Sequence, residues 1–388
     1  MTAAQRPQGA GVAQDTEDTQ DRGGARGPAC RVDSALRAAA GRYRILGETR
    51  VGMDPEGVVA DAATGLAYVA CSRSNAVSVV DLDTMTQTGS VGVGREPIDI
   101  VIDPRTRRVF TADARSDQVS VIDAGTGRVI AVIPVGAYPA GLGIDEENRR
   151  LYCGDTMGST MSVIDIDALE RVGTVTAELG AGAVAADPRA GRVYCVNFVA
   201  SSVTVVSAGD LRVVDRLPMS GWPCAVAVNP RLDEFYVVRS FPGGVVRLAS
   251  ASNETLAEMS TPVAPVGLAV GPEGDRLYLG NRGDGSVSVL GLDGLEWARI
   301  PVGAAPGGVA IHPGDPRVLL VANSGSGTLT VAEDLLDGPP AALPHQASHP
   351  LVGQRLPDFS LPDLRTGQMR HGREWAEKKY ILNFFASW

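Results

Sequence analysis

Residues 97–136 read PIDIVIDPRTRRVFTADARSDQVSVIDAGTGRVIAVIPVG, and this stretch decides the fold. Four short runs rich in β-branched residues stand at 98–102, 109–112, 119–123 and 129–135, separated by Asp-Pro, polar and Gly-Thr-Gly turns. Such runs between turn residues are typical of strands. No segment has the helical period of apolar residues, which excludes a helical repeat. We therefore predict four short antiparallel strands.

The same pattern returns along the chain with a spacing of 42 residues. The clearest ladder consists of large apolar residues: Tyr68, Phe110, Tyr152, Tyr194, Tyr236, Tyr278 and Leu320. A period of about 40 residues indicates stacked supersecondary units. A four-stranded sheet with two apolar faces has to pack between neighbours, so seven units without a polar capping unit predict radial closure. The predicted fold is all-β, a seven-bladed β-propeller.

The two ends of the repeat region together supply one blade. The last repeat has three strand-like runs, around 309–311, 318–323 and 328–333, and residues 335–340 cannot form a fourth. Residues 43–49, before the first repeat, look like a fourth strand that lacks its first three. We predict that this N-terminal strand pairs with the last blade and closes the ring without an open sheet edge.

The units at 98–104, 119–123 and 133–136 resemble the YVTN-type β-propeller repeat, and the resemblance covers roughly residues 43–340. It implies the fold and is nearly silent on function. Rings of this type serve as surface-layer modules, interaction platforms, amine dehydrogenase subunits, lactonases and lyases.

Composition divides the chain into four parts. Residues 1–41 are rich in Ala, Gly, Gln, Asp and Arg and are expected to be a disordered leader. The propeller is predicted at 42–340, a Pro/Ala/His linker at 341–352 and a separate C-terminal segment at 353–388.

Charge and hydropathy limit the kinds of partner and the location that the protein can have. A formal net charge of −10, without a basic stripe, argues against nucleic acid. No run of 18 apolar residues is present, so no membrane span is predicted. The leader lacks the apolar centre of a secretory signal, which favours a cytoplasmic location and leaves export open. The five cysteines are expected to be free, buried thiols, in agreement with a reducing compartment.

The ring is poor in side chains for covalent or acid–base catalysis. Both lysines lie near the C-terminus, at Lys378 and Lys379, so the ring has no amine for a Schiff base. His312 is the one histidine in the ring and stands where other repeats have the Asp of an Asp-Pro turn, which indicates a turn residue. The sequence assigns no catalytic residue and leaves enzymatic activity uncertain.

Two sets of loop residues are predicted to meet at one end of the central channel, where binding residues collect on a rigid scaffold. One set comes from the loops between blades and the other from the ends of the second strands. The candidate ligand-binding residues are Arg95, Asp99, Asp113, Tyr138, Asp155, Trp222, Arg239, Asn281 and Asn323.

Two interpretations of these residues stay open. Asn and Asp at the end of a second strand commonly close the following turn by binding backbone amides, which is a structural role. Arg239 and Trp222 depart from the repeat pattern, and with Arg95 and Tyr138 they are a hypothetical site for an anionic or aromatic ligand.

The alternative is a lactonase, hydrolase or lyase that depends on a divalent cation. Ca²⁺ accepts carboxylate and amide oxygens, and such a site in the channel would use Glu56, Asp113, Asp155 and Asn281. In the main prediction the ring holds neither metal nor cofactor.

The C-terminal segment carries two motifs in order. Pro357-Asp-Phe-Ser-Leu361 is followed by the apolar run 380–385 and by Phe385-Ala-Ser-Trp388. These residues resemble the start of thioredoxin-like thiol–disulfide oxidoreductases and peroxiredoxins. The resemblance spans about 36 residues and implies a Cys-x-x-Cys motif directly after Trp388. We expect residues 353–388, without the rest of that domain, to be poorly ordered or to lean on the ring.

Three explanations are open for the missing motif: a fragmentary record, a genuine truncation, or a UGA codon that is read as selenocysteine. The predicted function is a binding ring fused to a thiol–disulfide module, with a protein or small-molecule ligand at the funnel.

Overall fold

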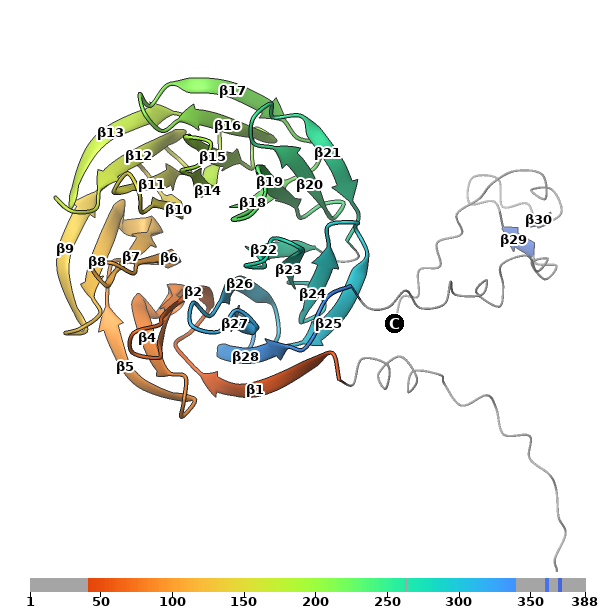
Figure 1. Cartoon of the computed structure of the whole chain (residues 1–388), viewed down its shortest axis with the longest axis horizontal. Coiled ribbons are helices and arrows are strands. Elements are labelled where there is room, and N and C mark those ends of the chain that lie inside the picture. The colour runs from red at the N-terminus through yellow and green to blue at the C-terminus, as the bar shows by residue number, and fades with distance from the viewer. Residues whose placement is uncertain (1–40, 262–263, 340–359, 363–368, 372–388) are drawn as a thin grey trace, which may run out of the picture. The chain divides into compact units, whose positions relative to one another are not determined.

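The computed structural model describes residues 41–261, 264–339, 360–362 and 369–371. Within these ranges the chain forms seven four-stranded sheets and one two-stranded sheet. Figure 1 shows the seven large sheets as blades around one central axis, in the order of the sequence. The predicted seven-bladed β-propeller is confirmed.

Each of the first six blades contains four strands that are consecutive in sequence and antiparallel. Blades 1 to 3 consist of β2 (Pro55–Asp61), β3 (Leu66–Cys71), β4 (Ala76–Asp81), β5 (Thr86–Gly92); β6 (Pro97–Asp103), β7 (Arg108–Asp113), β8 (Gln118–Asp123), β9 (Arg128–Pro134); and β10 (Pro139–Asp145), β11 (Arg150–Asp155), β12 (Thr160–Asp165), β13 (Glu170–Thr176). Blades 4 to 6 consist of β14 (Ala181–Asp187), β15 (Arg192–Asn197), β16 (Ser202–Ser207), β17 (Val213–Pro218); β18 (Pro223–Val228), β19 (Glu234–Arg239), β20 (Gly244–Ala249), β21 (Thr255–Met259); and β22 (Pro265–Val270), β23 (Arg276–Asn281), β24 (Ser286–Gly291), β25 (Glu296–Pro301). The two single-turn 3₁₀ helices of the described chain are η1 (Ser72–Ser74) and η2 (Ala114–Ser116).

Blade 7 joins the two ends of the ring. Its inner three strands are β26 (Pro306–Ile311), β27 (Val318–Asn323) and β28 (Thr328–Asp334), and its outer strand is β1 (Tyr43–Arg50). β1 runs antiparallel to β28, from Tyr43 opposite Asp334 to Arg50 opposite Thr328. The prediction that the N-terminal strand completes the last blade is confirmed.

The apolar core lies between the blades. The described side chains form seven buried clusters, and each combines residues of two neighbouring blades. The ladder residue of the second strand belongs to every one of them: Phe110 packs with Leu142 of blade 3, and Leu320 packs with Val58 of blade 1. Because the seventh cluster joins blade 7 to blade 1, no blade has an uncovered face.

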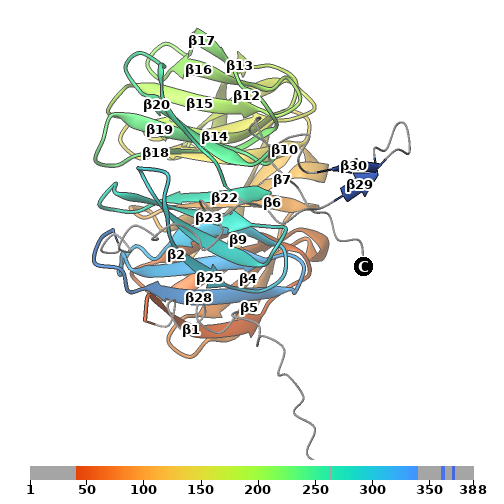
Figure 2. The same ribbon diagram turned by 90° about the vertical axis from the view of Figure 1, so that its right-hand side faces the viewer.

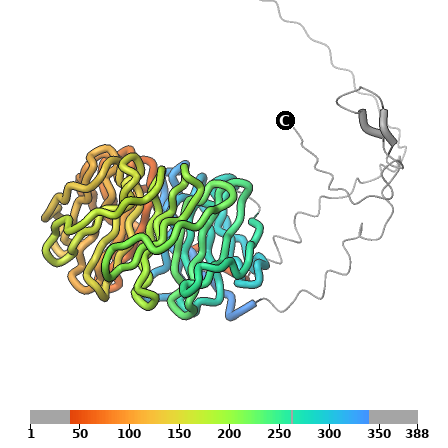
Figure 3. Tube along the Cα trace, turned by 90° about the horizontal axis from the view of Figure 1, so that it is seen from above, coloured from red at the N-terminus to blue at the C-terminus, as the bar shows by residue number. Residues whose placement is uncertain are grey.

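Seen edge-on (Figure 2 and Figure 3), the ring carries its connecting loops on two opposite faces. The inner strands β2, β6, β10, β14, β18, β22 and β26 surround the central axis in Figure 1. Every inner strand starts at the same face, so the first residues of all blades meet at one end of the channel.

Two smaller sequence predictions are also confirmed. Cys71, Cys153, Cys195 and Cys224 are free, and the first three are buried. His312 is a turn residue, since its Nδ1 accepts the Gly314 and Asp315 amides at 3.1 and 3.0 Å. Cys30 lies outside the described residues.

The parts predicted outside the ring are hardly described. Nearly all of the leader, the linker and the thioredoxin-like segment lie outside the described ranges. What is described of that segment is a pair of antiparallel strands, β29 (Ser360–Pro362) and β30 (Met369–His371). Among the described helices, none has the length and apolar composition needed to cross a membrane.

Deleting residues 1–50 removes β1 and exposes the edge of β28. Seven residue pairs join these strands. Their loss should lower the free energy of unfolding by at least about 3 kcal/mol, because each net hydrogen bond contributes about 0.5–1.5 kcal/mol. Urea denaturation measures the change. Deletion of residues 1–40, which spares β1, is the control, and equal stability of the two proteins contradicts the role of β1.

Candidate functional site

Two kinds of loop share one face of the ring: the loop that enters each blade and the loop between its second and third strands. Backbone hydrogen bonds tie them together, from the Ala114 amide to the Glu96 carbonyl (2.9 Å) and from the Thr156 amide to the Tyr138 carbonyl (2.9 Å). Glu96 and Tyr138 both have φ of 56°, which turns the chain toward the axis. We call the loops at this face the rim.

The polar residue that ends most second strands lies inside its own blade. Asn281 is fully buried and donates through Nδ2 to the hydroxyls of Ser286 (3.0 Å) and Ser288 (2.8 Å), five and seven residues further on. Hydroxyls at the same two offsets bind Asp155, Asn197 and Asn323. These side chains therefore fasten the second strand to the third.

Asp113 has the densest set of these contacts. Its carboxylate accepts hydrogen bonds from the hydroxyls of Thr111 (2.8 Å) and Ser120 (2.5 Å), from Gln118 Nε2 (3.2 Å) and from the Gly94 amide (3.0 Å). Burial raises the pKa of Asp113, and these hydrogen bonds oppose the shift. The Gly94 contact also connects the blade to the loop that enters it.

The structure corrects the predicted placement of these residues. Asp113, Asp155, Asn281 and Asn323 point into the gaps between strands of four different blades and do not line the channel. The structural interpretation, in which they bind neighbouring backbone and hydroxyl groups, fits the observed contacts. Equivalent positions in the repeat place these side chains between the strands of their own blades and not toward the common axis.

The four residues of the calcium alternative also do not come together in the channel. Of its four residues only Glu56 lines the channel. In the described part of the chain, no three His, Cys, Asp or Glu side chains come close enough to hold a metal ion.

Arg239 is the last residue of the second strand of blade 5, where most blades have Asp or Asn, and it is buried. Its Nη1 donates to Ser220 Oγ (2.6 Å) and its Nη2 to Glu258 Oε2 (2.9 Å), so the guanidinium replaces the usual Asn–hydroxyl contacts. Trp222, by contrast, is exposed on the rim. The predicted pairing of Arg239 with Trp222 around a ligand does not match these positions.

Arg95 and Tyr138 belong to a polar network of blades 2 and 3. Arg95 Nη2 donates to the Arg115 carbonyl (2.7 Å), and the Tyr138 hydroxyl donates to Glu96 Oε1 (2.7 Å). Glu96 also forms an ion pair with Arg115. Trp222 and Arg239 belong to blade 5, whereas Arg95 and Tyr138 precede the inner strands of blades 2 and 3. Among the described residues, no hydrogen bond joins one pair to the other.

Replacing Asp113 tests its structural role. Asp113→Ala leaves several donors unpaired and should lower the free energy of unfolding by about 2–4 kcal/mol. Asp113→Asn gives the residue that sibling blades use and should lower it by less than about 1 kcal/mol. Chemical denaturation compares the two. Equal stability of the Asp113→Ala variant and the wild type contradicts this role.

The start of the inner strands encloses a cavity of about 620 Å³. Its wall is mainly glycine, alanine and branched aliphatic residues, and its charged side chains are Glu56, Asp99 and Arg282. Arg282 Nη2 lies 3.0 Å from Glu56 Oε1 and 2.8 Å from Ser324 Oγ. Burial raises the pKa of Glu56, and Arg282 opposes that shift. Of the predicted ligand-binding residues, only Asp99 lines this cavity, together with Glu56 of the calcium alternative.

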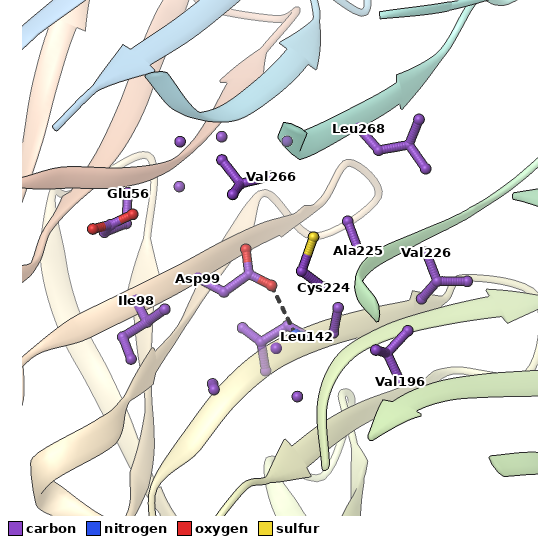
Figure 4. Close-up of a pocket in the computed structure, with 18 of the residues that line it drawn as sticks. Glu56, Ile98, Asp99, Leu142, Val196, Cys224, Ala225, Val226, Val266 and Leu268 are labelled. Carbon is purple, nitrogen blue, oxygen red and sulfur yellow. Dashed lines mark hydrogen bonds between the residues drawn. The ribbon is translucent and has the colours of Figure 1, made fainter. Parts of the chain in front are cut away.

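Asp99 lies at the bulge near the start of β6, and Figure 4 shows its carboxylate among the lining residues. It accepts hydrogen bonds from the amides of Ile100 (2.8 Å) and Leu142 (2.8 Å). Burial raises the pKa of Asp99 to about 6, and the two amides oppose the shift. A raised carboxyl pKa means that the ionised form is less stable in the folded ring than in the unfolded chain. The contribution of Asp99 to ring stability therefore decreases as pH rises from about 4 to about 6 and is constant above that range.

A second feature of this face is an exposed apolar surface that the sequence did not predict. Six large apolar side chains on the rim of blades 3 to 5 are 44–72% exposed: Met157, Leu179, Phe198, Val199, Trp222 and Phe241. We call this set the apolar rim. Hydrogen bonds link its loops in series, from Thr156 Oγ1 to the Ala181 carbonyl (2.8 Å) and from the Met219 amide to the Ser201 carbonyl (2.8 Å).

A repeat alignment contains the signal for this surface. The second residue after the end of the second strand is Arg73 and Arg115 in blades 1 and 2, then Met157, Val199 and Phe241, then Gly283 and Gly325. The rim therefore changes from charged to apolar to glycine around the ring. Phe198 also lines the cavity, so the apolar rim borders the channel mouth.

The fold has solved counterparts. A solved structure of Kuenenia stuttgartiensis hydrazine synthase is similar with a TM-score of 0.61, over 74% of this chain and 98% of that chain. The two sequences are 22% identical, so the similarity shows the β-propeller fold alone. No family model and no curated protein matches the chain.

Proposed function

We propose that the ring is a protein-binding module and that the apolar rim is its contact surface. The observation that carries this proposal is the gathering of six exposed, large apolar side chains on one sector of one face. A contiguous apolar patch bordered by polar residues is typical of a protein interface. Trp, Phe and Met are among the residues enriched in the centres of such interfaces.

The opposite sector of the rim differs in chemistry. Ion pairs join Arg73 to Asp54 (3.5 Å) and Arg115 to Glu96, and Arg282 pairs with Glu56. Exposed ion pairs add little stability, but they disfavour partners with the wrong charge. We infer that the partner places apolar side chains on blades 3 to 5 and polar groups over the remaining blades.

The C-terminal segment suggests a purpose for partner binding by the ring. The motifs of residues 353–388 support a thioredoxin-like domain fused to the ring, and the repeats themselves are, on the residues quoted above, of the YVTN type. In this proposal the ring brings a thiol–disulfide module to its partner. The free thiols of the ring support a reducing, cytoplasmic location.

A photo-crosslinking amino acid tests the apolar rim. Placed at Phe241 (68% exposed), it should yield discrete cross-linked proteins in the source cells, whereas at Leu295 (64% exposed), in the turn before β25, it should not. Adding Val199→Asp should reduce the Phe241 products at least about tenfold, because a desolvated charge removes more than about 1.4 kcal/mol of binding. Leu295→Asp is the matched control. Equal products from both positions, or products unaffected by Val199→Asp, contradict the proposal.

The redox part has a separate test. Mass spectrometry of the protein from its own cells should find a peptide beyond Trp388 with two cysteine or selenocysteine residues at Cys-x-x-Cys spacing. A native C-terminal peptide ending at Trp388 contradicts the redox part and leaves the binding proposal intact.

A further inference from the structure

The central cavity holds one negative charge that the ring does not neutralise. Glu56 is paired with Arg282. Asp99 has two amide donors, and among the described residues it has no cationic partner. We propose that the cavity binds a small organic cation, with a protonated amine paired to Asp99 and a short apolar body against the aliphatic wall. This proposal does not rest on the function proposed for the apolar rim, although Phe198 belongs to both surfaces.

The fold itself does not call for an acidic residue at this position. In the other six blades the equivalent residue is small: Gly57, Gly141, Ala183, Ala225, Gly267 and Gly308. A Cβ at Gly141 would lie 2.4 Å from the Gly182 carbonyl oxygen, and one at Gly267 would lie 2.2 Å from the Gly307 oxygen. Small residues therefore let neighbouring inner strands approach closely. Asp99 departs from this rule and leaves a charge that lowers the stability of the folded ring at neutral pH.

The geometry suits a bound ammonium. The Ile100 and Leu142 amides each occupy one lone pair of the Asp99 carboxylate and hold it in a fixed orientation. Further lone pairs remain available on both oxygens. An ion pair in a partly desolvated cavity is stronger than one on the surface, because water screens it less.

The size and lining of the cavity select the type of cation. Its volume of about 620 Å³ is within the range of small-molecule sites, about 300–1,000 Å³. Ile98, Leu142, Val226 and Val266 supply aliphatic wall (Figure 4). A metal ion would need several oxygen ligands, and the described side chains form no such group. An alkylammonium meets one carboxylate and fills apolar space.

Other titratable groups near Asp99 have defined states. Burial raises the pKa of the cavity thiol Cys224 to about 12, and it raises the pKa of Cys153 behind the wall, so both stay neutral. Glu56, whose pKa is also raised by burial, gains a proton in acid and then no longer neutralises Arg282. Protonation of Asp99 and protonation of Glu56 both oppose cation binding. The affinity for the cation should therefore decrease as the pH is lowered.

Calorimetric titration with n-butylammonium chloride tests the site at pH 7.5, with n-butanol as the neutral probe and KCl as the inorganic one. We expect saturable binding of butylammonium and of neither other probe. The affinity for butylammonium should be at least tenfold weaker in Asp99→Asn. It should be unchanged in Asp83→Asn, which alters an exposed carboxylate in the turn before β5. At pH 5 the wild type should bind about tenfold more weakly, since about one-tenth of a carboxyl with a pKa near 6 is ionised.

Asp99→Gly guards against a folding defect, because glycine is the equivalent residue in four sibling blades. It should fold, bind no butylammonium and have a higher melting temperature at pH 7.5 than the wild type. No saturable binding to the wild type, equal binding of butanol or potassium, or undiminished binding by Asp99→Asn or Asp99→Gly would each overturn the proposal.

Discussion

Each blade buries one large side chain of its second strand against the next blade, and the ring depends on this contact being made seven times. Tyr152 is fully buried among residues of blade 4, and Leu320 makes the corresponding contact with blade 1. A four-stranded sheet alone exposes two apolar faces. Only when the last contact closes on the first blade are all faces covered, so the stability of each blade depends on the whole ring.

The fold was readable from the sequence because spacing and turn chemistry agree in every unit. The 42-residue ladder and the three-strand last repeat together identified the number of blades and the origin of the closing strand. The orientation of the Asp and Asn residues that end the second strands was not predicted. The hydroxyls five and seven residues after Asn281 and Asn323 were a visible signal, but their meaning depends on the register of the next strand.

The candidate sites lie where the repeats differ from one another. The sequence was sufficient to select Asp99 as a funnel residue. It did not show that Asp99 lacks a cationic partner, because this depends on Arg282 extending across blade 7 to pair with Glu56. The apolar rim results from single substitutions in loops that share one backbone shape. A symmetric scaffold thus carries a strongly asymmetric face, and backbone and function are specified by different positions of the same repeat.

The pairing of β1 with β28 also has a consequence for synthesis on the ribosome. The strand made first finds its partner only after roughly 290 further residues have been added. At about 5–20 residues per second this takes about 15–60 s. During that interval the early blades stand as an unfinished arc with one uncovered face, exposed to nascent-chain chaperones and to neighbouring polysomes. Slow translation near the end of the ring therefore prolongs its period of greatest risk of aggregation.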